Sequence, residues 1–406
     1  DSLVEGEQEY TFDLGNNLGP NFTVLGLETE QYRIEGSVLT IEDGAISSVT
    51  WVSAGAGGAL EETVKNAFTL ALGEGSAANV SLGYLNGTLT TSGDKVYQIT
   101  NTGGTKINLN GVYNRGETLP SGNLNYRGDI WMDISGGAFG IISGGVTNEW
   151  STKLQTSTLT GDTHVQLSGN ATAEHVIGGN NKGASTTLTG NTNVTVKDNA
   201  IVAGAIIGGS TSAHNAVTTI TGNTSVLVTN VQYSNTAQNL DGGLSNSYII
   251  GGSSWSSNTT SGTTIQGSTS ATINLNGTEE HNSFVKTIIG GSYGNVNNAG
   301  TVNNINGDTS VSIIGREGIT FTGDIIGGSF ENSGQAQYTI GGNSSISISG
   351  GSTFTGNIYG GSYSKVPGNT GSTMTTAGNI TVELGTGTYR GNIYGAGNKG
   401  TAGGDV

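Results

Sequence analysis

The chain has no cysteine and only three prolines among its 406 residues. The absence of cysteine excludes disulfides, thiolate metal sites and cysteine nucleophiles. The shortage of proline, together with the lack of a period of three in the glycines, excludes a collagen triple helix. Charged residues are also scarce, at 11% of the chain against a usual value of about 25%. Because disordered chains usually carry high charge or much proline, we expect this chain to fold.

Long apolar runs are missing too. No stretch of about 18 apolar residues occurs, so we expect no insertion of this chain into a membrane as a helix. The first residues, Asp1–Glu5, do not resemble a signal peptide. The formal net charge is −16, and residues 1–62 hold twelve acids against a single base, Arg33. This charge argues against nucleic acid as a partner, because phosphates are bound by Lys and Arg.

Glycine, threonine, asparagine and serine dominate the composition, with 71 glycines in all. These residues are poor helix formers, and glycine supplies the positive φ that sharp corners need. The composition therefore predicts an all-β chain in which glycine marks the corners.

Three short patterns recur in a fixed order. The first is Leu/Ile-x-Gly-x-x-x-Val-x-Val, as in Leu188–Val196. The second is an aromatic residue, one residue, then Gly-Asp/Asn-Ile, as in Phe321–Ile325. The third is Ile-Ile/Tyr-Gly-Gly-Ser, as in Ile206–Ser210, and its first glycine returns at spacings of 30 to 43 residues. This scatter indicates one structural unit with connections of variable length.

A unit of this size cannot bury its own apolar face, so copies are expected to stack. Each unit holds three strand-like pieces and three corners, which predicts one turn of a parallel β-helix; a propeller blade has four strands. Equivalent residues should then form ladders. The first predicted inward ladder is Val194, Val226, Ala271, Val311, Ile346 and Ile380. The second is Val196, Val228, Ile273, Ile313, Ile348 and Val382. The third predicted inward ladder is Val176, Ile206, Ile249, Ile288, Ile325, Ile358 and Ile393. A predicted polar ladder at a corner is Ser210, Ser253, Ser292, Ser329 and Ser362.

The two ends of the chain differ. Residues 1–125 fit the repeat poorly and are expected to form an acidic N-terminal cap with irregular first turns. Within it, Val38–Ile41 and Ser48–Val52 read as strands, and helical spacing predicts one short helix near 59–72. Residues 126–406 are expected to form the repeat. Its last copy is well formed, so we expect the natural protein to continue beyond it.

Catalytic or metal-binding residues are not evident. Asp162 and Asp308 share a repeat position with asparagines, as does Asp324, which indicates turn chemistry. Arg127–Asp129 reads as a copy of the second pattern. Glu279–His281 is a cluster off the pattern, in a loop. No histidine pair has the spacing of metal ligands, so we expect no metal, no cofactor and no enzymatic activity.

An aromatic column is the candidate binding site. Tyr293, Phe330 and Tyr363 each follow the serine of Gly-Gly-Ser, and Trp255 comes one residue later. Such rings can stack on sugars or anchor partners; the alternative is a structural ladder in which each ring covers the one below. Polar loops over 254–264, 293–304, 330–338 and 363–376, and an insertion over 229–248, suit adaptable recognition.

These repeats resemble the degenerate repeats of bacterial autotransporter-type passengers over about residues 126–397. The resemblance implies a right-handed parallel β-helix on the bacterial surface or secreted, often an adhesin. The Gly-Asp-Ser-Gly-Ser motif of the serine protease subgroup is absent. We therefore predict an extracellular adhesin-like module that binds a host or bacterial surface glycan or protein, or associates with itself. The alternatives are a polysaccharide lyase or hydrolase, and an inert stalk.

Overall fold

The structure is a computed structural model. All the regular elements among its described residues are β-strands. It describes residues 10–13, 23–25, 32–35, 38–41, 68–72, 79–86, 89–90, 93–114, 124–148, 156–181, 186–212, 217–230, 248–256, 262–276, 283–295, 302–332, 336–365, 373–398 and 400–406. The prediction of an all-β chain is confirmed.

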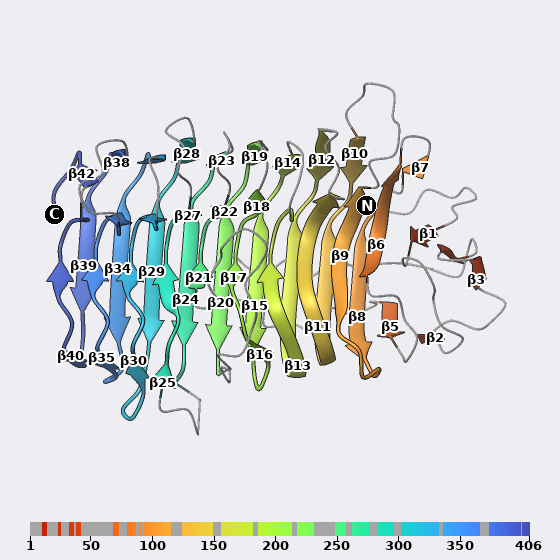
Figure 1. Cartoon of the computed structure of the whole chain (residues 1–406), viewed down its shortest axis with the longest axis horizontal. Coiled ribbons are helices and arrows are strands. Elements are labelled where there is room, and N and C mark those ends of the chain that lie inside the picture. Colours follow the sequence, from red (N-terminus) through yellow and green to blue (C-terminus); the bar gives the residue numbers. More distant parts are fainter. Residues whose placement is uncertain are drawn as a thin grey trace.

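The chain passes repeatedly through five rows of parallel strands, and each pass lies against the previous one (Figure 1). Row I contains β10 (Leu124–Arg127), β12 (Ser157–Thr160), β14 (Thr186–Thr189), β19 (Val217–Ile220), β23 (Gly262–Ile265), β28 (Val302–Ile305), β33 (Gln337–Ile340), β38 (Thr373–Thr376) and β42 (Gly400–Ala402). Row II contains β8 (Lys95–Asn101), β11 (Ile130–Asn148), β13 (Thr163–Ile177), β15 (Thr192–Lys197), β20 (Thr224–Thr229), β24 (Thr269–Asn274), β29 (Thr309–Ile314), β34 (Ser344–Ser349) and β39 (Ile380–Leu384).

The remaining three rows consist of very short strands. Row III contains β25 (Ser283–Phe284), β30 (Thr320–Phe321), β35 (Thr353–Phe354) and β40 (Thr388–Tyr389). Row IV contains β17 (Ile206–Ile207), β21 (Tyr248–Ile250), β26 (Thr287–Ile289), β31 (Ile325–Ile326), β36 (Ile358–Tyr359) and β41 (Ile393–Tyr394). Row V contains β18 (Thr211–Ser212), β22 (Ser254–Ser256), β27 (Tyr293–Asn295), β32 (Phe330–Glu331) and β37 (Tyr363–Ser364).

A complete coil such as β28 to β32 therefore has five strands, and the prediction of three per unit is wrong. The three predicted strands correspond to rows I, II and IV. Rows III and V were missed because their strands of two or three residues are too short to show an alternating pattern. The stacking itself is compatible with a parallel β-helix.

The N-terminal part combines both strand directions. β5 (Phe68–Leu72) and β6 (Asn79–Asn86) pair in parallel with β8 and β9 (Ile107–Asn114), so parallel stacking is already present before residue 126. β2 (Thr23–Leu25) lies antiparallel on β5. β4 (Val38–Ile41) confirms one predicted strand and joins β1 (Tyr10–Asp13) and β3 (Tyr32–Glu35). The remaining strands are β7 (Leu89–Thr90) and β16 (Ile201–Val202).

The predicted helix near 59–72 is wrong over the described residues 68–72. Those residues form β5, whose Leu70 and Leu72 alternate into the core and are 2% and 0% exposed. Pairing with β8 outweighs the helical spacing, because that pairing supplies backbone hydrogen bonds and burial together. Residues 59–67 and the predicted strand Ser48–Val52 lie outside the described residues.

The predicted apolar ladders form the core in all but the last coil. Val194, Val226, Ala271, Val311 and Ile346 pair in succession, and the ladder from Val176 to Ile393 is complete. In β39, however, Val382 pairs with Ile346 and Ile380 pairs with Ser344. The last members of two predicted ladders are therefore wrong by two residues. The backbone N–H of Asn379 donates to Asn343 Oδ1 at 2.9 Å, and this bond is consistent with the observed register.

The predicted serine ladder is a ladder of hydrogen bonds between coils. The hydroxyl of Ser253 accepts from the N–H of Ser210, and the same contact links each serine to the next as far as Ser362, at 3.0 to 3.1 Å. Inside the coil, the Thr224 and Thr269 hydroxyls donate across to the carbonyls of Gly251 and Gly290. The Gly-Gly-Ser corner is thus bonded both along the stack and across the core.

The Asp/Asn position that follows row I forms a second ladder. Each side chain accepts the backbone N–H of its equivalent in the next coil, in an unbroken series from Asp94 to Asp405 in which Ser268 takes the place of one Asp or Asn. The sequence correctly assigned these residues to corners, but their bonds run between coils and not within one turn. Burial, with Asp162 and Asp94 nearby, raises the pKa of Asp129.

The assignment of Arg127–Asp129 to the second sequence pattern is wrong. Tyr126 pairs with Leu159 in row I, so this segment is a copy of the first pattern and not of the second. The contact between the N–H of Asp162 and Asp129 Oδ1, at 2.6 Å, fixes that alignment.

Close approach of successive corners leads to a first testable prediction. A Cβ on Gly290 would overlap the carbonyl of Gly327 in the next coil, whereas a Cβ on Gly136 would meet nothing within 4 Å. We expect Gly290→Ala to lower the free energy of unfolding by about 1–3 kcal/mol and Gly136→Ala to leave it within about 1 kcal/mol. Denaturant unfolding followed by circular dichroism measures both. Equal midpoints for the two variants would contradict the close-packed corner.

Candidate functional site

The predicted aromatic column is real for three of its four members. Tyr293 pairs with Phe330 and Phe330 with Tyr363 in consecutive strands of row V. Trp255 is aligned with Gly294, and Ser254 is the residue that precedes Tyr293 in the column. The coil of Trp255 has a second serine before the ring, which shifts the tryptophan by one position.

The column belongs to a longer stack of rings, here called the outer aromatic ladder: Tyr248, Tyr293, Phe330, Tyr363, Tyr359 and Tyr394. Tyr248 lies 4.6 Å from Tyr293 between ring centroids, and Tyr293 lies 5.5 Å from Phe330. Phe330 and Tyr363 are stacked at 5.3 Å. Tyr359 is stacked on Tyr363 at 4.2 Å and on Tyr394 at 4.9 Å. The ladder of rings therefore runs along the direction in which the coils follow one another.

Tyr248, Tyr359 and Tyr394 were missed by the sequence reasoning. Tyr359 and Tyr394 stand at the second isoleucine position of Ile-Ile-Gly-Gly-Ser. Alternation along a strand places that position on the face opposite the core ladder. The substitution of tyrosine for isoleucine there was the available signal.

The ladder packs on an apolar surface outside the main core. Ile289, Ile326 and Tyr359 of row IV meet Tyr293 and Phe330 of row V in a separate cluster. Tyr293 and Phe330 are only 1% and 5% exposed, whereas Tyr363 and Tyr248 are half-buried. Burial raises the pKa of the Tyr293 and Tyr359 hydroxyls above its usual value. The rings thus pack row V against row IV. Tyr293, Phe330 and Tyr359 are covered by their neighbours, whereas Tyr394 at the end of the ladder is 44% exposed.

Two polar rows run beside these rings. On row V, Asn295, Asn332 and Lys365 each follow a ladder aromatic by two positions, and Asn332 Nδ2 donates to Asn295 Oδ1 at 3.4 Å. On row IV, Asp324 and Asn357 precede Ile326 and Tyr359 by two positions, and Asn357 Nδ2 donates to Asp324 Oδ1 at 3.3 Å. Asn295 lies within β27 and shares a face of that strand with Tyr293. Asp324 is near enough to Tyr359 to contribute to the raised pKa of its hydroxyl.

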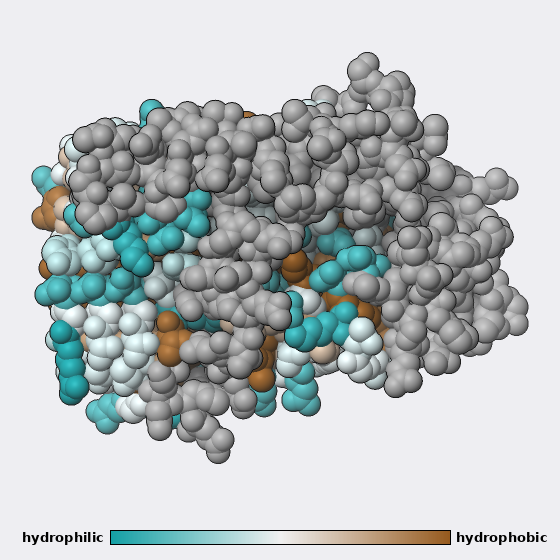
Figure 2. Space-filling model, in the orientation of Figure 1, coloured by the Kyte–Doolittle hydropathy of each residue, from teal (hydrophilic) through white to brown (hydrophobic). Residues whose placement is uncertain are grey.

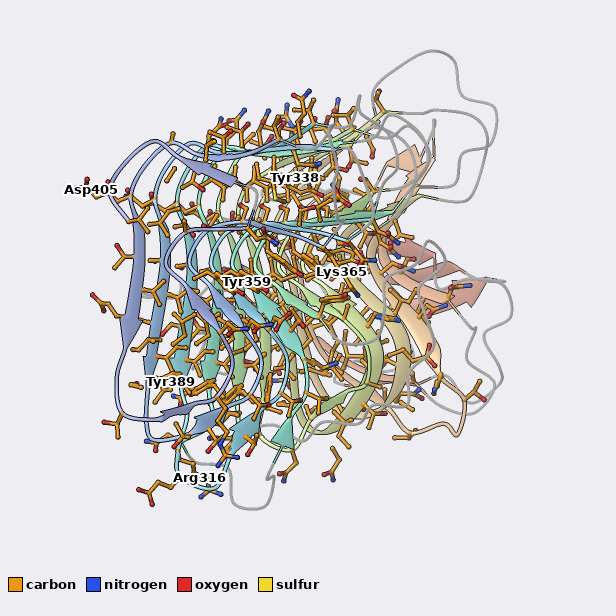
Figure 3. The ribbon with its side chains drawn as sticks, turned by 60° about the vertical axis from the view of Figure 1, so that its left-hand side comes forward. Arg316, Tyr338, Tyr359, Lys365, Tyr389 and Asp405 are labelled. Atoms are coloured by element: carbon orange, nitrogen blue, oxygen red, sulfur yellow. The ribbon has the colours of Figure 1, made fainter. Side chains whose placement is uncertain are left out.

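Figure 2 shows hydrophilic residues gathered in rows on this face toward the C-terminal end. In Figure 3, Lys365 and Tyr359 lie on the same side of the coil, and Tyr389 lies at its lower corner. Tyr389 belongs to a second aromatic stack, with Phe284, Phe321 and Phe354, at centroid distances of 4.8 to 5.2 Å. The three phenylalanines are 1% to 2% exposed and fill the core at row III.

Row V leads directly into the connections of variable length. The segments between rows V and I are 213–216, 257–261, 296–301, 332–336 and 365–372, and they range from four to eight residues. Because rows V and I stack in register, all these segments leave from one edge of the stack. Parts of the predicted loops are strands, since β27 and β28 occupy the two ends of 293–304. The other long connection, 230–247, joins β20 to β21.

A buried contact joins row V to row I at that edge. Glu331 is 0% exposed, and the hydroxyl of Tyr338, 1% exposed, donates to its carboxylate. Burial and the neighbouring carboxylate raise the pKa of the Tyr338 hydroxyl. Tyr338 lies beneath the strands of row I in Figure 3. This contact fixes the spacing of the two rows from which the connections depart.

The described carboxylates and histidines do not gather into a metal site; within the described ranges no three of them lie close enough to hold an ion. His164 stacks on Trp131 at 4.5 Å, and burial lowers its pKa to about 4. Glu279–His281 lies outside the described residues. The described part of the chain likewise has no helix that is long and apolar enough to cross a lipid bilayer.

Models of known protein families, characterised proteins and solved structures give no significant match to this chain.

A buried lysine generates a second prediction. The Lys286 ammonium, 1% exposed, donates to the carbonyls of Ala203 and Gly204, and burial lowers its pKa to about 7. Between pH 7 and 9.5 the unfolded chain keeps a proton on this lysine that the folded chain has lost. This lysine therefore makes the free energy of unfolding rise with pH, by up to about 1.4 kcal/mol per pH unit. In Lys286→Met that contribution disappears. Urea midpoints of both proteins across this range measure the difference, and parallel curves would refute it.

Proposed function

We propose that the chain is a right-handed parallel β-helix that forms an adhesin-like module of a bacterial surface protein of the autotransporter-passenger type. The parallel rows and the fixed order of strands in each coil support the β-helix. Parallel strands joined by crossovers are right-handed in about 98% of cases, which supports the hand. The repeats that resemble autotransporter passengers support an extracellular location.

The observation that carries the proposal is the constancy of the rows beside the variability of the connections. Rows I and V keep their register through successive coils, while the segments between them change in length and sequence. A scaffold that holds variable polar segments along one edge suits the recognition of a surface glycan or protein, or of another copy of the chain. An inert stalk needs no such edge.

The carboxylates give less support to a polysaccharide-cleaving enzyme. Asp129, Asp162, Asp308 and Asp324 all accept backbone N–H groups of the next coil. Glu331 is buried against Tyr338. Acid–base cleavage needs two carboxyl groups facing the same bound sugar, and these groups are engaged in holding coils together.

A third prediction tests the edge directly. Beads coated with the chain are expected to adhere to epithelial cells, to bacterial cells or to one another. Replacing residues 296–301 and 366–372 by Gly-Ser segments of equal length should reduce that adhesion by more than half, because the recognition groups lie there. Cell-bound beads and bead clusters are counted by microscopy.

The matched control is Ser345→Ala with Ser347→Ala, which alters the outer face of row II and leaves the edge intact. Unchanged circular dichroism of both variants establishes that the stack has folded. Adhesion that survives the double segment replacement would overturn the assignment of the edge. Absence of adhesion by the unaltered chain in all three assays would overturn the adhesin itself.

A further inference from the structure

Three tyrosines in mutual contact form one end of the outer aromatic ladder. Tyr359 lies between the other two, with its ring centroid 4.2 Å from that of Tyr363 and 4.9 Å from that of Tyr394. The ring planes of these two pairs differ by only 15° and 3°. Because ring centroids in aromatic pairs usually lie about 4.5–7 Å apart, Tyr359 and Tyr363 form a close pair.

The hydroxyl ends of this close pair lie together. Burial and the hydrogen-bonding hydroxyl of Tyr363 raise the pKa of the Tyr359 hydroxyl above its usual value. Since the rings are nearly parallel and their hydroxyl ends meet, the ortho carbons beside each hydroxyl also face one another. A tyrosine that loses one electron and its hydroxyl proton carries its unpaired spin on the oxygen and on these ortho carbons. The pair is therefore arranged for coupling between two tyrosyl radicals.

We propose that Tyr359 and Tyr363 are a site of oxidative cross-linking, at which a haem peroxidase with hydrogen peroxide joins the two rings as dityrosine. Each ring gives up one electron and its hydroxyl proton, and one carbon–carbon bond forms between ortho carbons. The hydrogen on each bonded carbon then moves to the oxygen of its own ring, which restores both hydroxyls. The two electrons and two protons reduce one hydrogen peroxide to two waters.

An oxidant can reach this site without unfolding of the stack. Tyr363 is half-buried, whereas Tyr359 is 5% exposed. Tyr363 is therefore oxidised first and takes an electron from Tyr359 across the ring contact. A second oxidation of Tyr363 then leaves one radical on each ring. Because the strands hold the two rings in place, their coupling needs no encounter between molecules.

The composition removes groups that would compete for the oxidant. The chain has no cysteine, and its two methionines, Met132 and Met374, are 0% and 2% exposed. Thiols and thioethers are otherwise readily oxidised side chains. Phe330 stacks on Tyr363 at 5.3 Å, but it has no hydroxyl proton to lose. The radicals are therefore kept on the tyrosines.

A second pair of tyrosines in the ladder is less suited to coupling. Tyr248 and Tyr293 lie 4.6 Å apart between ring centroids, but their planes differ by 39° and Tyr293 is 1% exposed. The closer and more nearly parallel pair spans the corner Gly360–Ser362. Its cross-link would join row IV to row V covalently, in a chain that has no cysteine for a disulfide.

The test is treatment of the dilute full chain with a haem peroxidase and hydrogen peroxide, followed by trypsin and mass spectrometry. Tyr359 and Tyr363 share the tryptic peptide 317–365, whereas Tyr394 belongs to peptide 391–399. We expect peptide 317–365 to lose two hydrogen atoms and to show dityrosine fluorescence. Fragment ions from breaks between residues 359 and 363 should disappear, because the cross-link holds the two pieces together.

Two variants identify the partners. Tyr363→Phe removes one partner and should abolish the loss of hydrogen within peptide 317–365. Tyr394→Phe is the matched control, because it removes the more exposed neighbour of Tyr359, and it should leave the product in place. Each variant loses a single hydroxyl, and unchanged circular dichroism before oxidation establishes that the stack has folded.

Four results would overturn the inference: no dityrosine, dityrosine only in covalent dimers of the chain, a cross-link between peptides 317–365 and 391–399, or a product that survives Tyr363→Phe. The last result would implicate Tyr338, the remaining tyrosine of peptide 317–365. The modification does not depend on what the connections between rows V and I bind, so the bead assay tests the adhesin separately.

Discussion

The close approach of one glycine corner to the next is the constraint on which the rest of the structure depends. At Gly251, Gly290 and Gly327 the position of a missing side chain is filled by the backbone of the next coil. This allows the N–H of each corner serine to reach the hydroxyl of the following serine. The threonine hydroxyls of row II then satisfy glycine carbonyls on the inner side of the corner. A side chain at these glycines would separate the coils and weaken all three sets of bonds.

Tight corners explain how the chain tolerates connections of very different length. The serine and Asp/Asn ladders fix the register of each coil independently of what lies between rows V and I. The entropic cost of closing a longer loop grows only slowly with its length. Insertions can therefore accumulate at one edge without moving the rows.

The aromatic residues illustrate two roles for stacked rings in one fold. Phe284, Phe321 and Phe354 fill the core at a row whose strands have only two residues. Tyr293 and Phe330 instead cover the outer face of row IV and hold row V against it. The outer ladder thus supports the short strands of row V, because a strand such as β32 has few backbone bonds of its own.

The sequence by itself predicted the stacking of repeated units and most of their ladders, since period, corner glycines and alternating valines recur visibly, but it indicated three strands in each unit where the structure has five. It also placed Tyr293, Phe330 and Tyr363 in one column, because each follows the same Gly-Gly-Ser. It failed where the tertiary structure chooses between similar local options. Residues 68–72 carry helical spacing but pair with β8, and β39 offers two registers of alternating apolar residues. The exclusion of Trp255 from the column and the addition of Tyr248 were likewise decided in three dimensions. Such choices depend on hydrogen bonds and packing between residues about one coil apart in the chain, and no local pattern records which neighbour the next coil will present.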